Sequence, residues 1–177
     1  VARYDKIHHF DIDLPTGESL RESHAYEAGA IACAVQSAGC RMGLTICYDL
    51  RFPSLYRTLA RAGAELLLVP SAFTVPTGQA HWHVLLRARA IETGSFILAA
   101  AQGGRHESGR ETFGHSLAVS PWGDILAEGG TDPAVIMADI DLRQVDAVRR
   151  RIPALAHDLP FGVESLKTLG SVATLKS

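Results

Sequence analysis

Residues 43–53 read Gly43-Leu44-Thr45-Ile46-Cys47-Tyr48-Asp49-Leu50-Arg51-Phe52-Pro53. In this stretch the spacing of apolar residues changes from that of a strand to that of a helix. The apolar run up to Cys47 is typical of a short buried strand. Pro53 suits the first turn of a helix, where its missing N–H costs nothing. Beyond it an apolar face recurs at helical spacing before Gly63, and it consists of Leu55, Tyr56, Leu59 and Ala60. The stretch therefore predicts a strand-to-helix turn that contains Cys47.

Cys47 is a candidate nucleophile because of this position. Such a turn holds a side chain exposed, places backbone N–H groups beside it and sets it near the positive end of a helix, which favours a thiolate. A buried structural cysteine is the plainer interpretation, since unpaired cysteines are common in protein cores. The local pattern leaves both interpretations open.

Short apolar strands and amphipathic helices flank this turn. We expect strands at 7–12, 32–35, 43–47, 65–70, 96–101, 115–120, 124–127 and 135–140, the second and third forming a hairpin around Gly39. We expect helices from Pro53, over 80–93 and over 142–151, with a loop marked by Pro76 and Gly78 before the second and a polar loop at 103–112. This mixture predicts an α/β protein with layers of helix and sheet around a shared core.

The composition excludes several classes of partner. The 177 residues carry a net charge of -2 and 47% hydrophobic side chains, so the chain has no electrostatic footprint for nucleic acid or an anionic membrane. Its one basic run, Arg149 to Arg151, is typical of a solvated helix face. No apolar stretch approaches the roughly 20 residues of a transmembrane helix. Three cysteines without a disulfide-rich context suit a reducing cytoplasm, where we place the protein.

Several motifs resemble those of the nitrilase superfamily of carbon–nitrogen hydrolases, most closely its Nit-like, omega-amidase-like branch. The run from Cys47 to Pro53 resembles the family's nucleophile motif, and residues 4–11, Tyr-Asp-Lys-Ile-His-His-Phe-Asp, resemble its lysine motif. Residues 70–92 resemble the loop and helix that follow, and residues 111–116 and 121–124 resemble its late hairpin. The resemblance runs from Tyr4 to about His157 with the motifs in the family's order, which makes it specific.

The resemblance implies a four-layer α-β-β-α sandwich and a Glu-Lys-Cys triad. It makes Cys47 the nucleophile and Lys6 the lysine, which with the backbone N–H of Tyr48 would stabilise the oxyanion. It gives Glu22 the part of an additional glutamate that holds Lys6 and helps to position water. Without the resemblance, Lys6 would be interpreted as an exposed lysine and Glu22 as a solvated carboxylate.

Four further residues are expected around the site. Asp49 and Arg51 could pair and brace the turn, or Arg51 could meet a substrate carboxylate. Phe73 and Thr74 are expected to line a pocket. His81 and His83 point to different sides of a helix and cannot share a metal ion, so we expect no metal site and no cofactor.

The expected activity is hydrolysis of the amide of a small, possibly omega-amido carboxylate, substrate to an acid and ammonia through a thioester. A Cys-His amidase using His81, His83 or His115 is the alternative enzyme, and a binding or scaffold protein of the same fold is the alternative outside catalysis. The family forms dimers, so we expect a homodimer or a higher homo-oligomer.

The domain is expected to be incomplete. Residues 1–177 read as the later portion of one carbon–nitrogen hydrolase domain, with a tail from about 158. The family's general-base glutamate lies upstream of the lysine strand, and only Val1 to Asp5 stand there. Asp5 adjoins Lys6, so the two side chains should point apart. We therefore expect that this chain cannot turn over substrate alone.

Overall fold

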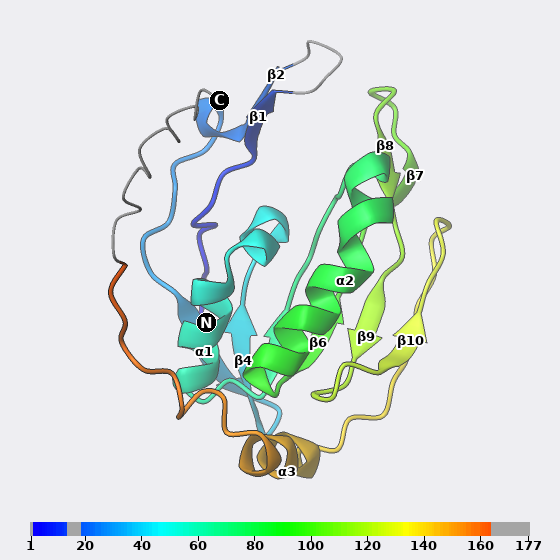
Figure 1. The fold of residues 1–177 in the computed structure, drawn as a ribbon. Coiled ribbons are helices and arrows are strands. Elements are labelled where there is room, and N and C mark those ends of the chain that lie inside the picture. Colours follow the sequence, from blue (N-terminus) through cyan, green and yellow to red (C-terminus); the bar gives the residue numbers. More distant parts are fainter. Residues whose placement is uncertain (1, 14–18, 164–177) are drawn as a thin grey trace, which may run out of the picture.

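Ten strands, three α-helices and two short 3-10 helices make up the structure, a computed structural model that describes residues 2–13 and 19–163 (Figure 1). The α-helices are α1 (Pro53–Arg61), α2 (Val75–Thr93) and α3 (Arg143–Arg151), and the 3-10 helices are η1 (Glu22–His24) and η2 (Cys47–Arg51). The strands are β1 (Asp11–Asp13), β2 (Ser19–Arg21), β3 (Cys33–Ser37), β4 (Cys40–Leu44), β5 (Leu66–Leu68), β6 (Phe96–Ala99), β7 (Gly103–Arg105), β8 (Glu111–Phe113), β9 (Leu117–Val119) and β10 (Ile125–Glu128). The α/β class is confirmed.

The central sheet has six strands in the order β10-β9-β6-β5-β4-β3. Strands β4, β5 and β6 are parallel, and the remaining pairings are antiparallel. The predicted hairpin around Gly39 is confirmed as β3–β4, and its turn places Ala38 and Gly39 at φ values of 49° and 75°. Two consecutive positive φ angles give a turn whose twist matches that of the flanking strands.

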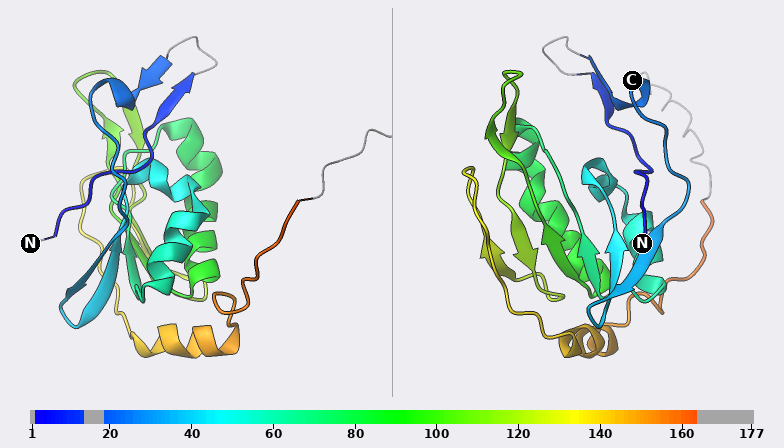
Figure 2. Two further views of the ribbon diagram at one scale, coloured as in Figure 1. Left: turned by 90° about the vertical axis from the view of Figure 1, so that its left-hand side faces the viewer. Right: turned by 180° about the vertical axis from the view of Figure 1, so that it is seen from behind.

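Helices α1 and α2 lie together on one face of this sheet (Figure 2). Their inward side chains, with Tyr56 and Trp82 the largest, are fully buried against Leu67 and Ile97 of the parallel strands. Alternate residues of the same strands point to the opposite face, where Val145 of α3 packs against Leu66, Phe96 and Cys40. The described part of the chain thus supplies one sheet and one helix layer, which is half of the expected four-layer arrangement.

The second helix starts earlier than predicted. We expected it at residue 80, after a loop, but α2 begins at Val75 and includes both Pro76 and Gly78. Pro76 lies in the first turn, where its missing N–H is not needed. Gly78 faces the later hairpin so closely that a Cβ atom there would lie 2.2 Å from the Phe113 ring. Both residues therefore belong to the helix for reasons that spacing alone does not show.

Three other predicted elements differ. Residues 7–10 are not a strand, because their backbone N–H groups bond to side chains: that of His8 to Asp49 and that of Phe10 to Glu22. The polar loop at 103–112 is instead the hairpin β7–β8. Residues 135–140 form no strand, although we predicted one there. The predicted strand 7–12 survives only as β1, paired with β2.

Helix α3 was predicted correctly, but its basic run is not wholly solvated. The Arg149 guanidinium donates to the carbonyl oxygens of Thr93 and Ala64 and to the Ser95 hydroxyl, at 3.1, 2.6 and 2.8 Å. Burial lowers the pKa of Arg149 from its ordinary value. Arg149 therefore docks α3 against the segments that precede β5 and β6, while Arg150 and Arg151 are exposed. Every helix in the described part of the chain is too short or too polar to cross a bilayer.

Candidate active site

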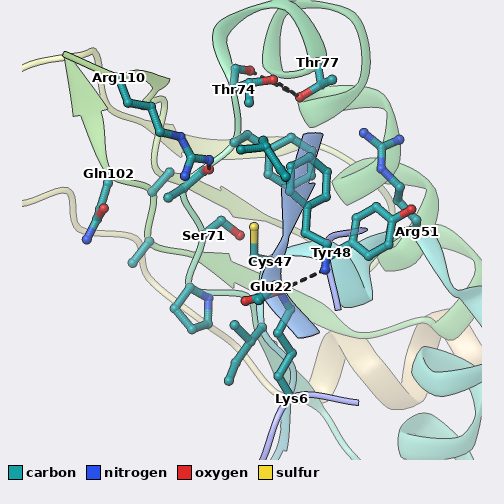
Figure 3. Close-up of a pocket in the computed structure, with 18 of the residues that line it drawn as sticks. Lys6, Glu22, Cys47, Tyr48, Arg51, Ser71, Thr74, Thr77, Gln102 and Arg110 are labelled. Atoms are coloured by element: carbon teal, nitrogen blue, oxygen red, sulfur yellow. Dashed lines mark hydrogen bonds and ion pairs between the residues drawn. The ribbon is translucent and has the colours of Figure 1, made fainter. Parts of the chain in front are cut away.

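A cavity of about 810 Å³ opens where the three parallel strands end (Figure 3). The segments that follow β4, β5 and β6 contribute Ile46 to Tyr48, Pro70 to Thr74 and Ala100 to Gln102. Side chains from the N-terminal segment and the late hairpin complete the lining, and they include Lys6, Glu22 and Arg110. The carboxyl ends of parallel strands are the usual place for a ligand site in an open α/β sheet, because the loops diverge there.

Cys47 occupies a strained position at the floor of this cavity. It begins η2 with a φ of 49°, which is unusual for a residue with a side chain. Its N–H donates to the carbonyl oxygen of Pro70 at 2.9 Å and thus continues the pairing of β4 with β5 past the strand end. Such strained backbone gathers at functional sites, where the surrounding structure holds it in place. The turn predicted around Cys47 is therefore present, with a 3-10 turn between it and α1.

Lys6 and Glu22 form an ion pair that lines the same cavity. The Lys6 side chain is only 11% exposed, and the Glu22 carboxylate also accepts the backbone N–H of Phe10 at 2.7 Å. Both groups are thus held by the chain around them. Asp5 points elsewhere: it is half exposed, pairs with Arg3 and does not line the cavity. Within the described residues, Glu22 is the one carboxylate of the lining.

Asp49 braces the turn, although not through Arg51 as expected. Its fully buried carboxylate accepts four hydrogen bonds, from Tyr4 Oη at 2.7 Å, Ile46 N at 2.8 Å and both the N–H and Nδ1 of His8 at 3.1 and 2.7 Å. Burial, together with the bond to Asp49, raises the pKa of Tyr4 above its ordinary value. Asp49 therefore ties the segment that carries Lys6 to the turn that carries Cys47.

Arg51, Phe73 and Thr74 line the cavity, as their positions suggested. The Arg51 guanidinium lies 5.6 Å from the centre of the Phe73 ring and contacts Nδ1 of His81 at 3.3 Å. Thr74 Oγ1 bonds Thr77 Oγ1 at 2.7 Å in the first turn of α2. The Arg51 guanidinium thus faces the cavity and does not form an ion pair with Asp49.

Sequence reasoning missed several lining residues. Ser71 and Gln102 follow β5 and β6, and Arg110 lies between β7 and β8. The first two could have been found from the rule that ligand sites gather after parallel strands. Arg110 and Arg21 could not, because nothing local shows which way a loop arginine points. With them, four cationic side chains and one carboxylate face the cavity.

Histidine takes no part in this cavity. All eight histidines lie in the described ranges, and none lines it. His81 contacts Arg51, while His83 and His115 both bond Glu128. The Cys-His alternative therefore lacks a histidine beside Cys47.

Comparisons with known proteins agree with this architecture. A family model described as carbon-nitrogen hydrolase matches residues 1–150. A protein of Synechocystis named deaminated glutathione amidase is 45% identical over 159 residues, which are 89% of this chain and 58% of that protein.

Solved structures give the same picture. The Caenorhabditis elegans NitFhit protein has a TM-score of 0.79 and 43% identity, over 89% of this chain and 38% of that one. A mutant of the Nesterenkonia sp. AN1 amidase, with acrylamide added at its active-site cysteine, has a TM-score of 0.69 and 29% identity, over 86% and 57%. The chain thus spans about half the length of the relatives it matches.

Proposed function

Because this chain belongs to the carbon–nitrogen hydrolase family, we propose that it hydrolyses the amide of a small carboxylate-bearing molecule to an acid and ammonia. One observation carries the proposal. Lys6, Glu22 and Cys47 come from three separate segments of the chain and line a single cavity. A thiol beside a held ammonium group is an arrangement suited to nucleophilic attack on a carbonyl carbon.

The first half of the reaction forms a thioester. In the mechanism that the family implies, the general-base glutamate, a residue other than Glu22, takes the proton of Cys47, and the sulfur bonds the amide carbon while the carbonyl oxygen becomes negative. When the C–N bond breaks, the nitrogen takes up a proton and leaves as ammonia. Water then attacks the thioester, the carbon–sulfur bond breaks, and the acid and the free thiol are released. Glu22 holds Lys6 and helps to position this water.

Two donors are available for the oxyanion. The ammonium group of Lys6 is one. The backbone N–H of Tyr48 is the other, because the first N–H groups of a helix have no partner within it. The N–H of Cys47 is not free for this purpose, since it already donates to Pro70.

The charge of the cavity supports a substrate that carries a carboxylate. Among the described residues, neither Arg51 nor Arg110 forms an ion pair: Arg51 contacts Nδ1 of His81, and Arg110 donates to the carbonyl oxygen of Ala72. A guanidinium group binds a carboxylate through paired N–H donors. The Synechocystis relative is named for an amidase of a glutathione derivative, a kind of molecule that carries carboxylates. We place such a group at Arg51.

Ammonia release tests the proposal. Purified protein that contains Lys6, Glu22 and Cys47 is incubated with a panel of omega-amides, carbamoyl compounds and nitriles. We expect the omega-amides to release ammonia fastest. Cys47→Ala should abolish release, whereas the matched Cys33→Ala, in β3 and away from the cavity, should retain it. Iodoacetamide should also label Cys47 faster than buried Cys40. Substantial release by Cys47→Ala would overturn the mechanism.

A further inference from the structure

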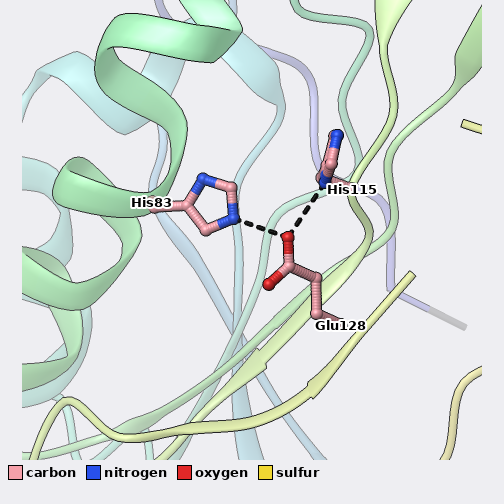
Figure 4. Close-up of side chains that lie close together, drawn as sticks. All are labelled: His83, His115 and Glu128. Atoms are coloured by element: carbon pink, nitrogen blue, oxygen red, sulfur yellow. Dashed lines mark hydrogen bonds and ion pairs between the residues drawn. The ribbon is translucent and has the colours of Figure 1, made fainter. Parts of the chain in front are cut away.

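A second group of chemically active side chains lies outside the cavity. His83 projects from α2, His115 lies between β8 and β9, and Glu128 ends β10 (Figure 4). One carboxylate oxygen of Glu128 contacts Nε2 of His83 at 2.8 Å and Nδ1 of His115 at 2.9 Å. These three ligand atoms lie within 4.8 Å of one another. The amide-hydrolysis mechanism uses none of them.

We propose that His83, His115 and Glu128 bind a divalent transition-metal ion, with zinc the best match. Two imidazoles and one carboxylate are a common zinc ligand set, which leaves a fourth position for water. Tetrahedral bonds of about 2.0–2.1 Å place neighbouring ligand atoms about 3.3 Å apart. The two contacts to Glu128 would lengthen by about half an ångström, and the two imidazole nitrogens, which lie within 4.8 Å of each other, would settle at the same spacing.

The surrounding structure holds His115 in place for this role. Its backbone has a φ of 57°, its N–H donates to Gly130 at 2.9 Å, and its carbonyl oxygen accepts the indole N–H of Trp82 at 2.7 Å. Its ring stacks on Phe113 with centroids 4.3 Å apart. A ligand fixed before the metal arrives loses little conformational freedom on binding.

Charge and access also suit a cation. Glu128 supplies a carboxylate oxygen that already faces both imidazoles, and carboxylate oxygens are ordinary ligands of a divalent zinc ion. The three side chains are 31%, 29% and 36% exposed, which lets an ion enter and keeps water in its open position. The ion would lie between the carboxylate and the two ring nitrogens, each of which binds a metal ion without a proton.

Binding would join three parts of the fold. The ion ties α2 to the segment before β9 and to the end of the edge strand β10. Since the unfolded chain does not hold these ligands together, the ion stabilises the folded state and raises the melting temperature.

Calorimetric titration of the untagged, chelator-treated full chain with zinc tests the site. We expect one ion per chain at this site and a raised melting temperature. His83→Gln and Glu128→Gln should each weaken binding at least about tenfold, because losing a direct ligand costs no less than losing an outer partner. His157→Gln, an exposed histidine elsewhere, is the matched control and should bind as the wild type does.

Cobalt distinguishes binding at this site from binding at the three cysteine thiols, because its absorption spectrum depends on the ligand atoms. The cobalt-loaded chain should show d–d absorption of a nitrogen and oxygen site without thiolate charge transfer. His83→Gln tests the idea even if His115→Gln fails to fold, because His83 is a partly exposed helix residue. Absent binding, thiolate absorption alone, or equal affinity in His83→Gln, Glu128→Gln and wild type would each overturn the proposal, leaving a hydrogen-bonded network.

Discussion

Single residues set the chemistry that we propose, and Lys6 is the first to test. Lys6→Met removes one oxyanion donor, so kcat should fall about 100- to 1,000-fold while KM changes little. Steady-state ammonia release measures both constants. Borohydride added during turnover should trap no substrate adduct on Lys6. A trapped adduct would instead make Lys6 a Schiff-base residue.

Asp49 is expected to matter for stability rather than chemistry. Each of its oxygens accepts one backbone N–H, His8 on Oδ1 and Ile46 on Oδ2. In Asp49→Asn the new NH₂ group must face one of these donors whichever way it turns. We expect the free energy of unfolding to fall by about 3 kcal/mol. Urea titration measures it, with the exposed Asp146→Asn as control; equal midpoints for the two variants would contradict this role.

At the scale of elements, the contact between α2 and the β7–β8 hairpin depends on Gly78. Alanine has the higher helix propensity by about 1 kcal/mol. The added Cβ would nevertheless meet the Phe113 ring. Gly78→Ala should therefore destabilise the chain by about 1–3 kcal/mol, as overpacking does.

Thermal unfolding measures this effect of Gly78→Ala. Gly130→Ala is the matched control, because a Cβ at Gly130 meets nothing within 4 Å. A higher melting temperature for Gly78→Ala would show that the hairpin yields easily and that helix propensity dominates.

At the scale of the whole molecule, self-association remains a prediction. Exposed apolar side chains on a helix would support such a contact. Helix α1 buries its apolar side chains and exposes Ser54, Thr58 and Arg61. On α2, Val84 and Ile91 are 68% and 54% exposed, so this helix is the expected contact.

Sedimentation equilibrium at micromolar concentration should show a dimer, since two-fold contacts are the usual form of homo-oligomer. Val84→Asp should shift the protein to monomer, because a charge would be buried in the interface. If the wild-type protein sediments only as a monomer at that concentration, the prediction of self-association is wrong.

The sequence by itself determined the local pieces of this protein. The hairpin at Gly39, the turn at Cys47 and the helices from Pro53 and over 142–151 follow from turn residues and apolar period, which act over a few neighbours. The resemblance added Lys6 and Glu22, and both line the cavity with Cys47. Their roles in catalysis remain proposals.

Only the tertiary structure decided which distant groups meet. Residues 7–10 have a strand-like sequence, yet the N–H groups of His8 and Phe10 donate to the carboxylates of Asp49 and Glu22. Arg51 lines the cavity and does not pair with Asp49. His83 lies close to His115, 32 positions away in the sequence, and not to His81, two residues away. Side-chain contacts of this kind depend on how the sheet and helices pack, and neither periodicity nor spacing along one element carries that information.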